Sequence, residues 1–459
     1  MKLILKSKLS RLRHPLVLGT MILTASGLIS RLIGFFYRIY LSRLFGEESM
    51  GVYQLISPVI SLAFSFCAAG YQTAVSKLSA ELAAKEKASF GPGSKRPLWA
   101  AISISLPLSL LSSAITYYGA VPIGSLLLKE PRTIPLLRII AFSFPFVGIH
   151  ACINGWFYGM KKAGLPSIAQ LIEQLTRVGC VYLVTAKDLA MSKTPAISTA
   201  VLGLSLGEVV SMLFALVTFL PFCAKKPAAL GAYHNTPSIY PGLLATSLPL
   251  TANRLVLTFL GSAESVAIPE MLRLHGYDTQ TALSVYGVLT GMALPLVFFP
   301  NALSGSMSVM LLPMISENYC LGNLEKVRSL TRQSLKYCLY LGALCFVIFS
   351  FGGRFLGRLL FHSALAGQCI QTLGFICPFL YLDTTLSGIL QGLGKSGSIF
   401  SINVISLLIR LAFVYLTIPA FGIKGYLWGM LAGQLLLSTL FLALLYRTFS
   451  AKGNINAIF

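Results

Sequence analysis

The chain contains the same segment twice, and this repeat limits its possible folds more than any other feature. Residues 145–177 and 378–410 lie 233 positions apart and are identical at nine of 33 positions without a gap, where composition alone would give roughly two or three. The shared positions include a proline at the start, three glycines and an arginine at the end. We therefore predict two related halves, and duplicated membrane bundles commonly bind their substrate between the halves near mid-membrane.

The composition is that of a membrane protein. Of 459 residues, 55% are hydrophobic and only 11% are charged, compared with about 25% charged residues in soluble proteins. Apolar stretches long enough to cross a ~30 Å hydrocarbon core as helices recur along the whole chain. We predict an all-α integral membrane protein with about twelve spans, near 16–44, 52–80, 98–118, 133–158, 165–186, 195–222, 241–262, 281–315, 334–352, 367–391, 398–419 and 424–446.

The basic residues predict the topology. The net charge of +22 would favour nucleic acid in a soluble chain, but here 21 Lys and Arg residues fall at the two termini and in the loops of one side, and nine in the opposite loops. The positive-inside rule places that basic side and both termini in the cytoplasm. A polar linker at 225–240 then separates two six-helix lobes, 1–224 and 241–459, which insert in the same orientation. No nucleic acid partner is expected.

Arginines inside the predicted spans indicate an anionic substrate. An arginine in hydrocarbon is costly, so it needs a partner or a water-filled cavity. Arg31 and Arg38 are seven residues apart and share one face of the first span, and Arg254 lies in the seventh span, which opens the second half. Guanidinium groups suit phosphate or carboxylate because they donate two parallel hydrogen bonds. We predict a cationic cavity; the alternative is that some of these arginines snorkel to the interface or form structural pairs.

The charged residues of the later spans leave two interpretations open. Glu173 and Arg177 are four residues apart on the fifth span, so they form either a self-neutralising pair or an ion-coupling site. Arg410, the repeat equivalent of Arg177, has no acid four residues before it, so it is either free for substrate or satisfied by a neighbouring helix. Asp383 and Glu208 are further candidates for ion coupling.

Glycine and proline inside the spans predict helix bends at Gly34, Pro145 and Pro378, because each weakens or removes a backbone hydrogen bond. The chain has neither a phosphate-binding glycine loop nor a metal-binding histidine motif, so we expect no cofactor, no metal and no enzyme activity. Transport would then depend on an ion gradient, the membrane potential or the substrate gradient. We expect the membrane potential to affect the rate.

A set of short motifs runs through most of the chain: SRLIGFFYR at 30–38, RLFG at 43–46, GVY at 51–53, SKLSAE at 76–81, GWFYGM at 155–160, EQ at 173–174, GMALP at 291–295 and SGILQGLGK at 387–395. These motifs resemble those of the stage V sporulation protein B-like proteins. That family belongs with the lipid II flippases and polysaccharide transporters of the multidrug/oligosaccharidyl-lipid/polysaccharide exporter superfamily. The resemblance covers both predicted halves.

The resemblance implies a V-shaped, two-lobed bundle that moves lipid-linked saccharide precursors across a bacterial cytoplasmic membrane by alternating access. The lipid carrier would be undecaprenyl pyrophosphate, bound by a cationic cavity to which we assign Arg31, Arg38, Arg254 and Arg410. We expect contacts with membrane lipids and cell-envelope synthesis enzymes, and a monomeric protein. A cation-coupled multidrug exporter of the same fold is the alternative, and it predicts a cavity dominated by carboxylates. A membrane enzyme and a scaffold without transport are less favoured; the saccharide itself stays open.

Overall fold

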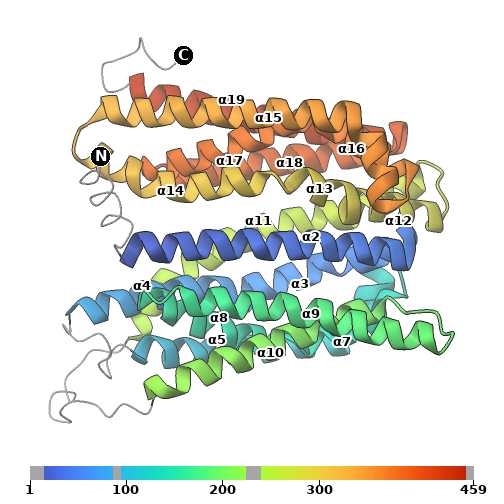
Figure 1. Cartoon of the computed structure of the whole chain (residues 1–459), viewed down its shortest axis with the longest axis horizontal. Helices are drawn as coiled ribbons and strands as arrows, with labels where there is room; N and C mark the ends of the chain where they lie inside the picture. The colour runs from blue at the N-terminus through green and yellow to red at the C-terminus, as the bar shows by residue number, and fades with distance from the viewer. Residues whose placement is uncertain (1–14, 86–94, 224–238, 451–459) are drawn as a thin grey trace, which may run out of the picture. The chain divides into compact units, whose positions relative to one another are not determined.

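The computed structural model describes residues 15–85, 95–223 and 239–450, and these residues form helices and no strand. Figure 1 shows that the long helices of each part of the chain run roughly parallel to one another. The helices are α2 Pro15–Leu55, α3 Ser57–Phe64, α4 Gly70–Lys85, α5 Arg96–Tyr118, α6 Ala120–Pro122, α7 Thr133–Ala141, α8 Phe144–Gly159, α9 Gly164–Ala190, α10 Ser198–Cys223, α11 Tyr240–Leu274, α12 Thr279–Gly287, α13 Leu294–Phe298, α14 Asn301–Cys320, α15 Leu324–Phe361, α16 Ala364–Leu373, α17 Cys377–Gly392, α18 Ser396–Phe421 and α19 Ile423–Ser450.

The lengths and hydropathy of these helices confirm a multi-pass membrane protein. Within the described residues, nine helical segments are long and apolar enough to cross a membrane, and a tenth is obtained when α7 and α8 are taken as one bent span. One segment, Ala25–Ala83, has 59 residues, although a span needs only about 20. Gly46 interrupts it with a φ of 76°, so the segment is not one continuous helix. The predicted number of twelve spans stays a prediction.

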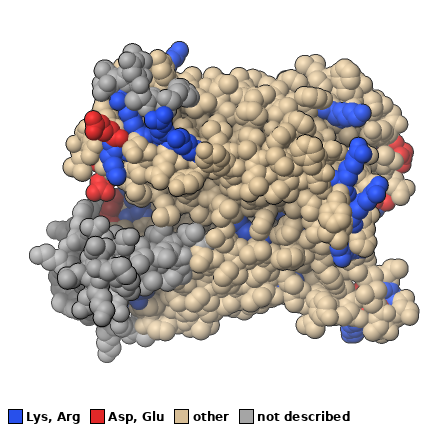
Figure 2. Space-filling view, turned by 45° about the horizontal axis from the view of Figure 1, so that its top comes forward, with Lys and Arg blue, Asp and Glu red and all other residues tan. Residues whose placement is uncertain are grey.

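Uncharged residues cover most of the surface between the helix ends. In Figure 2, most of the Lys and Arg side chains on the visible face gather toward the two ends of the helices, and a broad band with almost no charge lies between them. Many large apolar side chains stay exposed, such as Phe351 at 82% and Leu416 at 75%. Such a surface suits lipid, because hydrocarbon does not penalise exposed apolar groups.

The described chain forms two compact units, residues 1–37 with 56–259 and residues 38–55 with 260–459, here called the first and the second unit. Their boundaries fall inside α2 and α11, so each of these helices contributes to both units. The predicted linker, 225–240, lies almost entirely outside the described residues. The predicted lobes 1–224 and 241–459 therefore stay a prediction.

The two units contain the same internal framework. Helix α8 begins and ends 233 residues before α17, which is the spacing of the sequence repeat. Within the first unit α8 packs against α4, α5 and α10, and within the second unit α17 packs against α14, α15 and α19. The pairs α9 with α10 and α18 with α19 also correspond. The duplication seen in the sequence is thus also a duplication of helix contacts.

Glycines allow the equivalent helices to approach closely in both units. A Cβ added to Gly159 of α8 would lie 2.9 Å from Ser79 Cβ, and one added to Gly392 of α17 would lie 2.9 Å from Ile315 Cβ. These distances are too short for real contacts. Both copies of the repeat contain the glycine because α8 crosses α4, and α17 crosses α14, at this point.

A second set of glycines joins α10 to α9 in the first unit and α19 to α18 in the second unit. Helix α10 carries Gly203 and Gly207, and α19 carries Gly429 and Gly433, so each has the small-xxx-small spacing that brings membrane helices together. A Cβ on Gly207 would lie 2.9 Å from the carbonyl oxygen of Glu173, and one on Gly433 would lie 2.6 Å from Cγ of Arg410. This packing positions charged side chains of α9 and α18 against the neighbouring helix.

The second span of each half is interrupted twice, at corresponding places. The first interruption is at Ile56 in one half and at the π-helical segment η4, Val288–Ala293, in the other. The second interruption is the π-helical segment η1, Ser65–Ala69, in the first half and the break at 299–300 in the second half. With an offset of 233 residues, both interruptions coincide. A π turn often marks a functional site.

The predicted bends have different outcomes. The chain is helical at Gly34, and the non-helical residue of α2 is Gly46, so a bend at Gly34 is not observed. Gly46 has a φ of 76°, in the left-handed region that glycine tolerates best. Pro145 lies in the first turn of α8, directly after the 45° bend between α7 and α8. Pro378 likewise lies in the first turn of α17, after the short 3₁₀ segment η5, Gly374–Ile376. Both prolines begin a new helix after a break.

Candidate functional site

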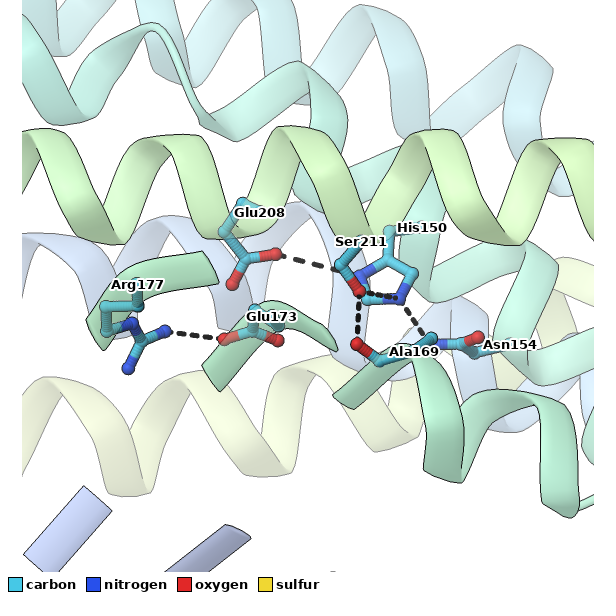
Figure 3. Close-up of polar contacts among 7 residues, drawn as sticks. All are labelled: His150, Asn154, Ala169, Glu173, Arg177, Glu208 and Ser211. Atoms are coloured by element: carbon cyan, nitrogen blue, oxygen red, sulfur yellow. Dashed lines mark hydrogen bonds and ion pairs between the residues drawn. The ribbon is translucent and has the colours of Figure 1, made fainter. Parts of the chain in front are cut away.

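Charged side chains inside the first unit meet where three helices join. Helix α8 contributes His150 and Asn154, α9 contributes Glu173 and Arg177, and α10 contributes Glu208 and Ser211. We call these six residues the first-unit cluster (Figure 3). On each helix the two residues are three or four positions apart, so they lie on one face. The three faces converge because Gly207 lets α10 approach α9 closely.

Glu173 and Arg177 form an ion pair along α9. Arg177 Nη2 donates to Glu173 Oε1 at 2.5 Å, and the side chains are 17% and 14% exposed. The i, i+4 spacing in the sequence therefore gives the contact that it predicts. The pair lowers the cost of both charges in the membrane. Other polar groups of the first-unit cluster lie near this pair, so the contact alone does not decide between a structural role and ion coupling.

His150 connects α8 to the acidic residue of α10. His150 Nδ1 lies 3.7 Å from Glu208 Oε2. The other ring nitrogen, Nε2, lies 2.8 Å from Asn154 Nδ2 and 3.1 Å from Ser211 Oγ, and that hydroxyl also lies 3.0 Å from the carbonyl oxygen of Ala169. Both ring nitrogens are thus engaged by polar groups. The ring is fixed between a carboxylate and an amide.

A partly open pocket of the first unit borders this cluster at Glu208. Its volume is about 260 Å³, and its wall is formed by α3, α8 and α10. The wall is largely apolar, with Phe64, Phe144 and Val147 among its residues, and Glu208 supplies a charged group. The space is large enough for several water molecules. Glu208 is therefore in contact with a volume that water can occupy.

The second unit has a polar site at the equivalent place, with different chemistry. Asp383 of α17 stands 233 residues after His150. Its Oδ2 accepts from Gln434 Nε2 at 2.5 Å and its Oδ1 accepts from Ser438 Oγ at 2.6 Å, both on α19. Gln434 follows Gly433 as Glu208 follows Gly207. Asp383 is only 4% exposed, so two neutral donors enclose a buried carboxyl group.

Arg410 pairs with an acid that lies 146 residues earlier. Its Nη2 and Nε donate to Glu264 Oε1 of α11 at 2.7 and 3.1 Å, and Tyr426 Oη donates to the same oxygen at 3.0 Å. The Glu264 side chain is 4% exposed. Of the two alternatives for Arg410, the structure shows that a neighbouring helix satisfies it. Substrate binding by Arg410 stays a prediction, which this ion pair does not support.

Two of the predicted cavity arginines are exposed and have no counter-charge. Arg31 of α2 and Arg254 of α11 both belong to the first unit, and both side chains are exposed. Within the described ranges, neither forms a hydrogen bond or an ion pair. Arg38 is half-buried, belongs to the second unit and has polar contacts of its own. Arg31 and Arg254 are thus cations without a partner among the described residues.

The sequence did not predict Glu264 as a partner, nor the pairing of His150 with Glu208. Both contacts join helices that are far apart in the chain, so no local spacing indicates them. The G-x-x-x-G motifs at 203–207 and 429–433 could have indicated that α10 and α19 pack closely against neighbouring helices. Among the described residues, no group of three or more His, Cys, Asp or Glu side chains could hold a metal ion.

Comparisons with protein families agree with this geometry. The model of the family described as "Polysaccharide biosynthesis protein" matches residues 16–319, and the MatE model matches residues 271–416. The chain is 28% identical to stage V sporulation protein B of Bacillus subtilis, over 92% of this chain and 82% of that protein. It is 23% identical to the lipid II flippase MurJ of the same organism, over 86% of this chain and 76% of that protein.

Solved structures show the same fold at low sequence identity. A multidrug resistance MATE family transporter of the MOP superfamily superposes with a TM-score of 0.71 and 16% identity, over 92% of this chain and 95% of the other. A structure of the lipid II flippase MurJ superposes with a TM-score of 0.69 and 15% identity, over 94% and 87% of the two chains. The predicted transporter fold is confirmed.

Proposed function

Because the chain belongs to the polysaccharide biosynthesis protein family of the MOP superfamily, and so is a multi-pass membrane transporter and not an enzyme, we propose that it moves undecaprenyl-pyrophosphate-linked saccharide precursors across the bacterial cytoplasmic membrane by alternating access. Its relatives include a lipid II flippase and a sporulation protein. The proposal extends the chemistry in the flippase's name to this chain. The precursors would serve peptidoglycan or surface polysaccharide synthesis.

The observation that carries the proposal is the pair of uncompensated arginines, Arg31 and Arg254. An unpaired arginine at the centre of a membrane helix costs at least roughly 2.5–3.5 kcal/mol. Elsewhere in the fold, ion pairs neutralise such charges, as at Arg177 and Arg410. The cost of these two uncompensated positive charges is offset if an anionic ligand binds to both guanidinium groups. A pyrophosphate offers several oxygens to which both groups can donate. The polyprenyl tail can stay in lipid meanwhile.

A reconstituted flipping assay tests this proposal. The protein is placed in vesicles with a fluorescent undecaprenyl-pyrophosphate disaccharide, and transfer between leaflets is followed with a membrane-impermeant quencher. We expect Arg31→Ala and Arg254→Ala each to slow transfer on the order of tenfold to a hundredfold, because a hydrogen bond to a charged group contributes roughly 1.5–3 kcal/mol. Arg→Lys should restore part of the rate, because an ammonium lacks the planar fork.

Arg358→Ala is the matched control, since Arg358 is an exposed arginine of α15 in the second unit. It should leave the rate unchanged. Wild-type rates in Arg31→Ala and Arg254→Ala would refute the role of the two arginines. Export of organic cations in exchange for protons or sodium, without lipid transfer, would favour the multidrug exporter.

A further inference from the structure

The end of helix α15 is closed partly by its own backbone. An α-helix ends with carbonyl groups that have no partner inside the helix. At the end of α15, His362 has a left-handed backbone conformation, with a φ of 56°, and its N–H donates to the carbonyl oxygen of Arg358. The N–H of Ser363 donates to the carbonyl oxygen of Gly357. The carbonyl groups of the next residues point beyond this turn.

Arg43 of α2 donates to two of these carbonyl groups. Its Nη2 lies 2.6 Å from the carbonyl oxygen of Leu359, and its Nε lies 2.7 Å from that of Leu360. All three residues belong to the second unit. A guanidinium is well suited to this place, because the end of a helix carries a partial negative charge and charge-assisted hydrogen bonds are the stronger ones. We call these two hydrogen bonds the Arg43 contact.

The Arg43 contact differs from the arginines assigned to the substrate. The edge formed by Nε and Nη2, which could bind a phosphate with two parallel bonds, already faces the carbonyl groups. An anion would also be repelled by the end of the helix. Glu47 lies four residues after Arg43, but among the described residues the two form no ion pair. Arg43 therefore binds the end of α15, whereas Arg31 has no such partner.

Close backbone packing holds the following residues of α2 in the same unit. A Cβ added to Gly51 would overlap the backbone of Leu283 in α12. One added to Gly287, at the end of α12, would overlap the backbone of Glu47 and Gly51. Arg43 and these contacts together fix residues 43–51 against α15 and α12.

The preceding part of α2 is packed much less tightly. Between residues 25 and 36 only Ser26 and Ser30 are buried, whereas ten of the residues from 37 to 56 are buried. A Cβ added to Gly27 would meet no atom within 4 Å. The chain is helical from Arg31 to Arg43, twelve residues that span roughly 18 Å. The axial position and the rotation of this helix are thus set mainly at its tightly packed end.

The second half of the chain has no equivalent of the Arg43 contact. Gly276 stands 233 residues after Arg43, and the corresponding helix, α11, ends before it at Leu274. The contact is therefore not part of the duplicated framework. It belongs only to the helix that carries Arg31 and Arg38.

We propose that Arg43 is a positioning residue, which attaches α2 to the end of α15 and thereby sets the position and rotation of the helix that carries Arg31. Successive residues of a helix are about 100° apart, so a small rotation or shift of α2 would turn the Arg31 guanidinium away from its ligand. Two hydrogen bonds in fixed geometry oppose such a movement. The effect on substrate rests on the proposed function, but the attachment itself does not.

Hydrogen exchange tests the attachment without any substrate. The full-length protein in lipid nanodiscs is followed by mass spectrometry of peptides from the end of α15, residues 352–363. We expect Arg43→Ala to speed exchange there roughly tenfold, because the last turn opens more often when its charged partner is lost. Arg43→Lys should give a smaller change, because an ammonium lacks the planar fork.

Arg354→Ala is the matched control for exchange. Arg354 is an exposed arginine of α15 that donates to the side chain of Gln371 at 3.1 Å and not to a carbonyl group of the helix end. It should leave exchange at residues 352–363 within about twofold of the wild type. Equal exchange in Arg43→Ala and the wild type would overturn the attachment. Monodisperse elution of each variant confirms that it is folded.

A double-mutant cycle in the flipping assay tests positioning. Arg43→Ala alone should slow lipid transfer roughly tenfold, and Arg43→Lys should restore part of the rate. In a protein that already carries Arg31→Ala, Arg43→Ala should slow transfer by less than about twofold more, because the group that it positions is absent. A general loss of stability would instead slow both backgrounds equally. Equal slowing, or a wild-type rate in Arg43→Ala, would overturn positioning.

Failure of this inference and failure of the proposed function are distinguishable. A wild-type rate in Arg31→Ala would overturn the proposed function and the effect of Arg43 on substrate together, and the exchange result would still decide whether Arg43 holds the end of α15. Slow transfer in Arg31→Ala with a wild-type rate in Arg43→Ala would keep the proposed function and overturn the positioning role alone.

Discussion

The cluster of the first unit and its counterpart in the second unit share a framework and differ in charge. Both lie where α9 meets α10, or α18 meets α19, at a G-x-x-x-G motif, and both place a polar residue of α8 or α17 against α10 or α19. In the first unit an imidazole meets a carboxylate beside a cavity. In the second unit a carboxyl group meets neutral donors, and the arginine is bound to a distant acid.

This difference shows which part of a duplicated structure is free to diverge. Helix ends and close glycine contacts are set by backbone packing, and a change there would disturb every neighbouring helix. The charged groups need only suitable partners, which different side chains can provide. The second unit pairs Arg410 with a distant acid, whereas the first unit pairs Arg177 with Glu173 and holds Glu208 beside His150.

The largest expected effect is on the buried pair of the second unit. Glu264→Ala should destabilise the protein by about 3–5 kcal/mol, because Arg410 would stay inside the fold without a counter-charge. Glu173→Ala should cost less, because the side chains of that pair are 14% and 17% exposed whereas Glu264 is 4% exposed. Thermal unfolding in detergent measures both. Replacing Glu264 and Arg410 together with Gln and Met should recover much of the loss, and equal losses in the two units would contradict the contrast drawn here.

A smaller and symmetric effect is expected at the shared glycines. Gly159→Ala and Gly392→Ala should each destabilise the protein by roughly 1–3 kcal/mol, because the added methyl group overpacks a tight helix crossing. Gly164→Ala and Gly397→Ala are the matched controls. These glycines are also repeat equivalents, but an added Cβ would meet no atom within 4 Å. Clearly different costs at Gly159 and Gly392 would show that the two crossings are not equivalent.

The smallest effect is expected at a cap found in one half alone. Asp278 accepts hydrogen bonds from the backbone N–H groups of Gln280 and Thr281 at the start of α12, whereas Phe45 stands at the corresponding position of the first half. Hydrogen bonding, with Thr281 as the largest contributor, lowers the pKa of Asp278. Its stabilising contribution is therefore present above the pKa of the unfolded chain and is lost as pH falls through the lower folded pKa. Asp278→Ala should lower the unfolding temperature slightly at neutral pH and have no effect in strong acid.

The sequence predicted what depends on local spacing. Repeats, apolar stretches and the Glu173–Arg177 contact all follow from neighbours in the chain, and the resemblance of the short motifs implied the transporter fold. The partner of Arg410 could not be predicted, because Glu264 lies on another helix and its orientation depends on tertiary packing. His150 and Glu208 carried no sign of their pairing for the same reason. A bend was expected at Gly34, where the chain is helical, and the non-helical residue of α2 is Gly46, which lies between the predicted spans 16–44 and 52–80.

The charges of α9 also affect how the polypeptide enters the membrane during synthesis. Each ionised side chain near the centre of a helix adds roughly 2.5–3.5 kcal/mol to the free energy of leaving the translocon for lipid, and α9 is not among the segments apolar enough to span alone. Pairing Arg177 with Glu173 offsets part of that penalty, but Glu208 and Gly207 belong to α10, which emerges from the ribosome later. We therefore expect helix α9 to remain beside the translocon until α10 has been made, and the two helices to enter the bilayer together as a hairpin.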